Sequence, residues 1–323
     1  MTNNLDIQNI INNIKKELKI DMLVGSDIRL KLNRISTGIE QLDKILGGGI
    51  PRKRTTIFVG DFSTGKTYIA LQIIKSVQGQ GGIAAFVDVE KTFDKDWAEK
   101  IGVNVDNLIV SQPTFGDEAI DIIVELLKNN VDIIVLDSIA ALIPPEEYDE
   151  RTGHQFIGLQ ARLVNKALRK ITACYNLDNK SIFIAINQLR ANIGGYGIKE
   201  TMPGGMGQEF FASLIMKVAR RGWITDVEEG KRKIGFNIEC LLTKSKISPP
   251  FQSCIIPFLF TTGQIDEISS IMQLAIDGGI VEKKGNTYFY KGDKLSVGKG
   301  GLLDYLKVQP EMFNQIKEQV LSL

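Results

Sequence analysis

One short stretch limits what this chain can be more than any other part of it. Residues 60–67 match the pattern GxxxxGK[ST], in which a glycine-rich turn leads into a lysine and a hydroxyl residue. The stretch follows the apolar run Thr56–Val59 and precedes Ile69, Ile73 and Val77, which recur every four residues. A strand, a turn and a helix are the context that the pattern requires, so the sequence predicts a phosphate-binding loop. This loop consists of Gly60, Asp61, Phe62, Ser63, Thr64, Gly65, Lys66 and Thr67.

The residue types in the predicted loop each suit the binding of a nucleoside triphosphate. Glycines let the backbone curl so that successive N–H groups point at a polyphosphate, and the helix N-terminus adds a partial positive charge. We expect Lys66 to bridge the β- and γ-phosphates and the Thr67 hydroxyl to ligate Mg²⁺. A chance glycine turn is the alternative, and the flanking strand and helix argue against it.

Apolar runs alternate with helical patterns through the middle of the chain. Nearly continuous apolar runs suit strands that are buried on both faces of a parallel sheet. The pattern therefore predicts an α/β fold, a P-loop NTPase core with a mainly parallel central sheet. The expected strands are Thr56–Val59, Ile83–Val89, Ile133–Leu136 and Ile182–Ile186, followed by Leu214–Val218 and Phe236–Leu242 as a hairpin.

We expect three regions. Residues 1–34 form an N-terminal segment whose amphipathic helix, Leu5 to Leu18, either packs on its own domain or docks on a neighbouring subunit; the sequence does not choose. Residues 35–264 form the ATPase core. Residues 265–323 form a small α/β C-terminal domain, in which a helical pattern precedes the run Asn286–Tyr290 and a final helix.

Composition indicates the cellular compartment of the protein but does not identify a binding partner. The 39 basic residues nearly cancel the 38 acidic ones, so overall charge does not indicate a nucleic-acid partner. The three cysteines have no metal-ligand or redox spacing and are expected to be buried thiols. We find no secretory signal and no run of apolar residues long enough to cross a bilayer, and we expect a cytoplasmic protein without membrane contact.

Three polar residues stand at the ends of predicted strands, where ligands of α/β sheets bind. Asp137 is placed to hold the magnesium shell, although capping of the next helix is the common alternative for a lone aspartate. Glu90 is expected to orient and deprotonate the attacking water. Gln188 is expected to sense the γ-phosphate and to pass its presence to the following loop.

These residues, in this order, resemble the RecA family of ATP-dependent homologous recombinases of bacterial and phage type. The resemblance covers nearly the whole chain, and it implies the RecA-like core. It is carried by Ile35-Ser36-Thr37-Gly38, Phe86-Val87-Asp88-Val89-Glu90, Ile101-Gly102-Val103, Val135-Leu136-Asp137-Ser138, Ile186-Asn187-Gln188-Leu189-Arg190 and Tyr288-Phe289-Tyr290-Lys291-Gly292. Phosphate-site motifs alone would not separate this family from helicases, whereas the linked series does.

The resemblance implies how ATP and Mg²⁺ are held and how ATP binding is coupled to assembly of the subunits. Trp97 falls where the family places an aromatic ring against adenine, with Asp94 near the exocyclic amine. Lys244 and Lys246 match lysines that reach the γ-phosphate of the neighbouring subunit and contribute to catalysis there. Without the family, two lysines at this spacing are more simply a solvated strand face. Phe210 aligns with an aromatic residue that relays the nucleotide state between subunits.

The resemblance also implies a helical filament on single-stranded DNA that pairs it with homologous duplex DNA. Two loops, about 144–157 and 191–207, match the DNA-binding loops, in which Ile157 and Ile193 fall where apolar side chains separate base triplets. The second loop contains a glycine pair. The other residues expected at the DNA are Arg162, Arg169, Arg190, Gly204 and Gly205, of which the arginines would meet phosphates.

The chain departs from the family where a second DNA site is expected. Glu239 and Leu241 stand at positions that the family fills with basic residues, which puts capture of the incoming duplex in doubt unless residues 231–233 replace them. Glu209 stands where the bacterial type has a lysine at the subunit interface. Two alternatives therefore remain: a ring helicase with the same core, and a DNA-bound filament that acts mainly as a scaffold or activator. A small-molecule kinase would need an acceptor site, and we recognise none.

Overall fold

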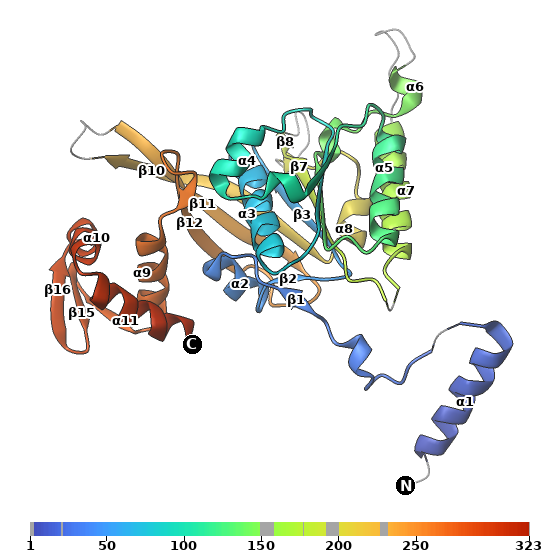
Figure 1. Cartoon of the computed structure of the whole chain (residues 1–323), viewed down its shortest axis with the longest axis horizontal. Coiled ribbons are helices and arrows are strands. Elements are labelled where there is room, and N and C mark those ends of the chain that lie inside the picture. The colour runs from blue at the N-terminus through green and yellow to red at the C-terminus, as the bar shows by residue number, and fades with distance from the viewer. Residues whose placement is uncertain are drawn as a thin grey trace.

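A twisted central sheet organises the chain in the computed structural model, which describes residues 3–20, 22–148, 158–176, 178–191, 200–226 and 232–322 (Figure 1). The described residues place nine strands in this sheet, in the order β13-β12-β11-β10-β3-β7-β6-β4-β5. In that order the strands are Gln264–Ile265, Ser253–Leu259, Arg232–Ser245, Leu214–Asp226, Thr55–Gly60, Ile182–Gln188, Ile133–Asp137, Ala84–Asp88 and Leu108–Ser111.

Strand directions confirm the predicted α/β class. The strands from β10 to β5 in spatial order pair in parallel, and β11, β12 and β13 extend the sheet with antiparallel pairs. The predicted hairpin is the long β10–β11 pair. One boundary was wrong: Ile83 does not begin a buried strand, because β4 starts at Ala84 and Ile83 remains 54% exposed.

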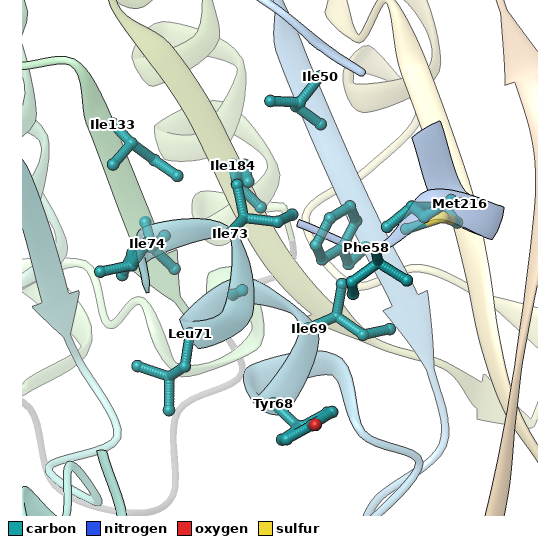
Figure 2. Close-up of a cluster of buried hydrophobic side chains, with 14 of the residues drawn as sticks. Ile50, Phe58, Tyr68, Ile69, Leu71, Ile73, Ile74, Ile133, Ile184 and Met216 are labelled. Atoms are coloured by element: carbon teal, nitrogen blue, oxygen red, sulfur yellow. The ribbon is translucent and has the colours of Figure 1, made fainter. Parts of the chain in front are cut away.

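Helices cover both faces of the sheet, and strand residues alternate between the two layers. Helices α2 (Glu40–Leu46), α3 (Lys66–Gly79) and α4 (Lys95–Ile101) pack on one face, and α5 (Gly116–Lys128) and α7 (Leu159–Ala173) pack on the other. Figure 2 shows side chains of α3 directed at the sheet, with Ile69 near Phe58 of β3 and Ile73 near Ile184 of β7. Burial of these apolar side chains fixes α3, and with it the phosphate loop, against the strands.

The N-terminal helix α1 (Asn3–Leu18) lies away from the core at the end of an extended segment (Figure 1). Ile7, Ile10 and Leu18 on this helix are 43%, 55% and 62% exposed. The segment continues through the 3₁₀ turn η1 (Ile28–Leu30) into a short antiparallel pair of β1 (Arg34–Ile35) with β2 (Ile50–Pro51). Within the described ranges, every helix is too short or too polar to span a lipid bilayer.

The C-terminal region has a small core of its own, made by a three-stranded antiparallel sheet and three helices. Buried Val281, Tyr288, Tyr290 and Leu295 of the sheet pack with apolar residues of the helices. The elements are α9 (Glu267–Asp277), β14 (Val281–Lys284), β15 (Thr287–Tyr290), β16 (Asp293–Val297), α10 (Lys299–Val308) and α11 (Pro310–Leu321).

Both segments expected to be irregular contain some regular structure. The first begins with a short helix, α6 (Pro145–Tyr148), after the 3₁₀ turn η3 (Ile139–Ala141). The second is closed at its base by a small pair, β8 (Arg190–Ala191) with β9 (Glu200–Thr201), and runs into α8 (Gly207–Phe211). Another 3₁₀ turn, η2 (Val105–Asn107), precedes β5. Ile157 and Ile193 lie outside the described residues.

Candidate nucleotide and DNA site

The phosphate loop begins where β3 ends and is shaped by close contacts with β10 and β11. A Cβ atom on Gly60 would lie 2.0 Å from the carbonyl oxygen of Val218, so a larger residue does not fit there. Gly65 has a φ of +99°, and a Cβ atom there would lie 2.6 Å from Cδ1 of Ile238. Both glycines are therefore required by the packing of the loop against the sheet as well as by its curl.

Lys66 is folded back into the loop. Its Nζ donates to the carbonyl oxygens of Gly60 at 2.9 Å and Asp61 at 2.5 Å. Burial lowers the pKa of Lys66, and the nearby carboxylates of Asp137, Glu90 and Asp61 oppose that shift. The ammonium group thus sits inside the loop with carbonyl partners that an anionic ligand can replace. Phe62 at the tip of the loop is 85% exposed.

Asp137 and Thr67 meet as the sequence predicted, although they come from different elements. Asp137 ends β6 and is 5% exposed, and its Oδ2 accepts a hydrogen bond of 2.7 Å from Oγ1 of Thr67 at the start of α3. A hydroxyl and a carboxylate oxygen side by side match the hard oxygen ligands that magnesium prefers. The pKa of Asp137 is raised to about 6, chiefly by burial and with smaller contributions from Glu90 and Asp88, while the hydrogen bond from Thr67 opposes the shift.

This raised pKa makes stability of the metal-free protein depend on pH. Because the folded state binds the proton of Asp137 more tightly than the unfolded state, stability should fall as pH rises from about 4 to about 6. Asp137→Asn removes the ionisation and keeps an acceptor for Thr67. We expect it to stabilise the protein at pH 7 by about 1–3 kcal/mol and much less at pH 4. Thermal unfolding with a chelator checks this; a gain that is equal at both pH values would contradict it.

Glu90 lies at the centre of a small polar group beside the loop. Its Oε1 accepts from Oγ of Ser138 at 2.5 Å and from Nε2 of Gln188 at 3.2 Å. Asp88 does not bond to this group; it accepts from the backbone N–H groups of Thr92 and Phe93 and from Nε2 of Gln112. Glu90 is exposed, so a water molecule can reach its carboxylate. The arrangement brings a base and an amide together next to the phosphate loop.

The two residues expected near adenine are both engaged within the chain. Asp94 caps α4, since its Oδ1 accepts from the backbone N–H of Trp97 at 2.9 Å. The Trp97 ring is partly buried on the core and meets Phe258 edge to face, with ring centroids 6.2 Å apart. Lys100 lies over the same ring, 5.5 Å from its centroid. These contacts fix the orientation of the tryptophan, whose assigned role stays a prediction.

Lys244 and Lys246 do not point at the phosphate loop of their own chain. Nζ of Lys244 donates to the carbonyls of Glu209 and, at 3.0 Å, Ala212, and Nζ of Lys246 donates to the carbonyl of Phe210 at 2.6 Å. Both ammonium groups therefore hold the C-terminal end of α8, where carbonyl oxygens lack helical partners. Burial and the neighbouring charge of Lys246 lower the pKa of Lys244. The Phe210 side chain on this helix is 70% exposed.

Strand register separates the two lysines from the phosphate loop. Lys244 pairs with Ile215, which is level with Ile57 of β3, while the loop begins after Gly60. The backbone N–H of Lys246 donates to Ser213, which is level with the first residue of β3. At about 3.3 Å per residue, Lys246 lies about 15 Å along the sheet from the loop. One chain therefore presents the loop at one end of its sheet and the lysines toward the other.

The arginines expected at DNA are on the surface. Arg162 and Arg169 lie on the same face of α7, two turns apart, and both are exposed. Neither forms an ion pair with a described residue. Lys166 and Lys170 on the same helix instead pair with acidic residues of α5. Arg190 begins β8 and is also exposed.

Gly204 and Gly205 form a tight turn at the root of the second loop. Both have positive φ, +90° and +78°, and a Cβ atom on Gly205 would lie 2.9 Å from Cβ of Ala161 in α7. Analysis of the sequence missed the polar contacts that hold this turn. Nδ2 of Asn187, next to Gln188, donates to the Pro203 carbonyl at 2.9 Å and to Oε1 of the buried Gln208 at 2.7 Å.

Ser138 and Gln208 are thus functional candidates that the motifs did not single out. Ser138 carries no signal apart from following Asp137, and its contact with Glu90 joins residues 48 apart. Gln208 directly follows Gly207 and belongs to no recognised motif. Only the fold reveals that its amide links α8 to the end of β7. A chain of contacts therefore runs from Glu90 through the end of β7 to the helix held by the lysines.

Comparison with known proteins agrees with this geometry. A family model described as RecA N-terminal domain matches residues 5–265, and one described as RecA C-terminal domain matches residues 269–323. A relative called Protein RecA from a Nostoc species is 40% identical over 301 residues, which cover 93% of this chain and 83% of the relative. That of Thermus aquaticus is 39% identical over 322 residues, covering 98% and 93%. That of Corynebacterium pseudotuberculosis is 42% identical over 303 residues, covering 93% and 80%.

A phosphate loop on a mostly parallel sheet, with a carboxylate on a nearby strand meeting the loop hydroxyl, defines a P-loop NTPase. Within that class, the chain belongs to the RecA family. The predicted fold and family are confirmed. The chain is accordingly a RecA-type recombinase, and its nucleotide-binding core is that of a DNA-dependent ATPase.

Proposed function

We propose that the nucleotide is ATP and that Mg²⁺ accompanies it at Thr67 and Asp137. The γ- and β-phosphates replace the loop carbonyls as partners of Lys66, whose charge then stabilises the phosphate oxygens. Magnesium bound there would neutralise the negative charge that develops on the phosphates. The adjacent oxygens of Thr67 and Asp137 support this assignment. Trp97 and Asp94 remain our proposal for the adenine side of the site.

Hydrolysis is assigned to Glu90, which orients the attacking water and accepts its proton. Gln188 holds the carboxylate through Nε2 and is within reach of the same region, so a γ-phosphate can compete for this amide. Because Asn187 ties the end of β7 to Gln208, movement of Gln188 is passed to α8 and to the second DNA loop. This is the order–disorder coupling expected of a γ-phosphate switch.

The proposal that chains assemble around a shared nucleotide site is supported by the separation between the phosphate loop and Lys244 and Lys246 of the same chain. Since one chain holds Lys244 about 10 Å and Lys246 about 15 Å along its sheet from its own loop, we propose that they complete a site only on a neighbouring copy. Repetition of this contact is heterologous, and it builds an open filament when the rotation does not close. Imaging on DNA with a non-hydrolysable ATP analogue separates this filament from the ring of a helicase.

The proposed partner of the filament is single-stranded DNA, which it pairs with a homologous duplex. Exposed Arg162, Arg169 and Arg190 supply phosphate contacts that do not read sequence. The two loops, with Ile157 and Ile193, would separate the bases, and Gly204 and Gly205 let the chain turn close against α7.

ATP turnover measured with and without single-stranded DNA tests the proposed function directly. We expect DNA to raise turnover at least about tenfold, because ordering of the loops completes the catalytic group between adjacent chains. Substitution of both Arg162 and Arg169 by alanine should raise the DNA concentration needed and reduce the salt dependence of binding. Equal turnover with and without DNA would remove the basis for the proposal.

A scaffold or activator role remains the second candidate, and one contact favours it. Glu239 forms an ion pair with Arg221 at 2.8 Å, so this part of β11 offers no net positive charge to a second DNA strand. Leu241 lies on the same strand. Measuring strand exchange alongside filament formation distinguishes the candidates, since a scaffold forms filaments without exchanging strands.

Helix α1 supplies a second contact between copies. An apolar groove of about 650 Å³ on α5 is lined by Ile109, Ile122 and Leu126, with acidic residues at its rim. The apolar stripe of α1, which lies away from its own core, matches this groove in character. We propose that the groove receives α1 of the adjacent chain. We also propose that the N-terminal segment 1–34, to which α1 belongs, is distinct from the core 35–264 and from the region 265–323.

Replacing Ile10 with aspartate should therefore weaken assembly at least about tenfold, because burial of one isoleucine contributes about 1.5–3 kcal/mol. Asn12→Asp places the same charge on another exposed position of α1 and serves as the control. Sedimentation with ATP analogue and DNA measures both variants. An equal loss from the two would point to charge on the helix rather than to loss of the apolar contact.

A further inference from the structure

Two cysteines face each other across neighbouring strands of the central sheet. Cys240 of β11 is paired in register with Cys254 of β12, and both side chains lie against the same hydrophobic core. Cys240 is fully buried, and Cys254 is partly buried against the same core. Among the described residues, β13 pairs only with Phe258 and Leu259, so β12 is an edge strand at Cys254. The pair thus lies at a point of the sheet that small molecules can reach from one side.

The geometry suits a bond between the two sulfur atoms. Directly opposed residues of an antiparallel pair have Cα atoms about 4.5–5.5 Å apart, which is within the range of disulfides. Both side chains pack against the same core, so the two sulfur atoms lie on the same face of the sheet. Cys174, the third cysteine, instead donates to the Lys170 carbonyl at 3.3 Å within its own helical turn.

The two thiols differ in reactivity. The adjacent Cys254 side chain and complete burial raise the pKa of Cys240 well above its usual range, so Cys240 keeps its proton at neutral pH. Cys254 is the more accessible thiol, so an oxidant from solution reaches it first. One sulfur is therefore placed to be attacked by an oxidant and the other to resolve the product.

We propose that Cys240 and Cys254 form a reversible disulfide site, closed by hydroperoxides, that controls the nucleotide site through β11. The Cys254 thiolate attacks hydrogen peroxide, which gives a sulfenic acid on Cys254 and releases hydroxide. Cys240 then attacks the Cys254 sulfur, and its proton leaves with the sulfenic hydroxyl group as water. In total, two thiols and one peroxide give one disulfide and two waters, and a dithiol reductant reverses the change.

Strand β11 links the cysteine pair to both halves of the nucleotide site. Cys240 pairs with Val218 of β10, whose carbonyl oxygen packs against Gly60 at the start of the phosphate loop. Ile238, two residues before Cys240, contacts Gly65 of the loop, and Lys244 follows four residues after it on the same strand. Because a disulfide ties β12 to β11, it restricts the motion of a strand that touches the loop on one side and carries the lysines on the other.

This control of the site rests on the proposed function, whereas formation of the bond does not. We therefore expect two separate results from full-length protein treated with hydrogen peroxide. In a Cys174→Ser background, intact mass should fall by two hydrogens, and both remaining thiols should stop reacting with a maleimide. Affinity for an ATP analogue should fall at least about threefold, the size of effect expected between residues in contact, and a dithiol should restore it.

Two variants keep each part testable. Cys254→Ala removes the accessible thiol at little cost in volume, so neither the mass nor the affinity should respond to peroxide. Cys240→Val retains Cys254 alone, which should add oxygen rather than lose hydrogen. Stable sulfinic acid on Cys254 with Cys240 still free would overturn the disulfide site. A disulfide without any change in affinity would overturn the control of the nucleotide site, and reduced protein that binds no ATP analogue would instead reject the proposed function.

Discussion

A mixture of Lys66→Ala and Lys244→Ala chains is expected to hydrolyse ATP, although neither variant does so alone. Lys66→Ala empties the phosphate loop of its cation, and Lys244→Ala removes a cation that reaches the loop of the adjacent chain. Loss of such a cation across an interface lowers turnover by about 10³-fold or more. In a mixed filament some interfaces combine an intact loop from one chain with an intact Lys244 from the next, so these sites are whole.

The expected size of the recovery follows from random mixing. In an equal mixture, the intact loop and the intact lysine meet at about a quarter of the interfaces, since each is contributed by half of the chains. DNA-stimulated turnover should therefore approach about a quarter of the wild-type rate at equal total concentration. A coupled assay for ADP, run across mixing ratios, should give a maximum near equal amounts of the two variants.

A second mixture provides the control, because both of its lesions lie on the same half of the site. Glu90 and Lys66 belong to one chain and one side of the interface, as their hydrogen-bonding groups beside the phosphate loop show. Lys66→Ala mixed with Glu90→Gln leaves no interface with an intact loop side, so turnover should stay at the level of the variants. Recovery in this control, or its absence in the first mixture, would mean that the site is not shared between chains.

The sequence predicted those parts of the site that depend on neighbouring residues or on buried strands. The phosphate loop is local, and its flanking strand and helix could be recognised from apolar spacing. The approach of Asp137 to Thr67 was also predictable, because the carboxyl ends of parallel strands lie at one edge of a sheet. Ile83 was misplaced because apolar character alone does not mark where a strand becomes buried.

Other features depend on contacts between distant segments and had no sequence signal. Nothing in the residues around Ser138 indicates that its hydroxyl reaches Glu90, and nothing around Lys246 indicates that its ammonium group holds α8. Cys240 and Cys254 are 14 positions apart by number, without redox spacing, and only the register of β11 with β12 makes them neighbours. The expectation of three buried thiols was wrong for Cys174 and Cys254, which are partly exposed, because sequence spacing does not report burial or cross-strand pairing.

The contacts around Glu90 suggest how hydrolysis and assembly can be separated. Glu90 is hydrogen-bonded to Ser138 and Gln188 rather than to Lys244 or Lys246, so we expect it to act on the water and not on the interface between chains. Glutamine at this position keeps the shape and a carbonyl acceptor for Ser138, while it lacks a basic oxygen for the proton. Binding of ATP and hydrolysis of ATP should therefore respond differently to this change.

Glu90→Gln is expected to lower DNA-stimulated turnover by about 10²–10⁴-fold while leaving affinity for ATP within about threefold. Because hydrolysis releases the interface, filaments of this variant on single-stranded DNA should persist longer with ATP than those of the wild type. Single-turnover assays and the dissociation rate from labelled DNA measure the two effects. Glu99→Gln, which changes an exposed carboxylate paired among the described residues with Lys95, is the matched control and should behave as the wild type. If Glu90→Gln instead weakened ATP binding in proportion to turnover, Glu90 would support the bound nucleotide and another group would have to activate the water.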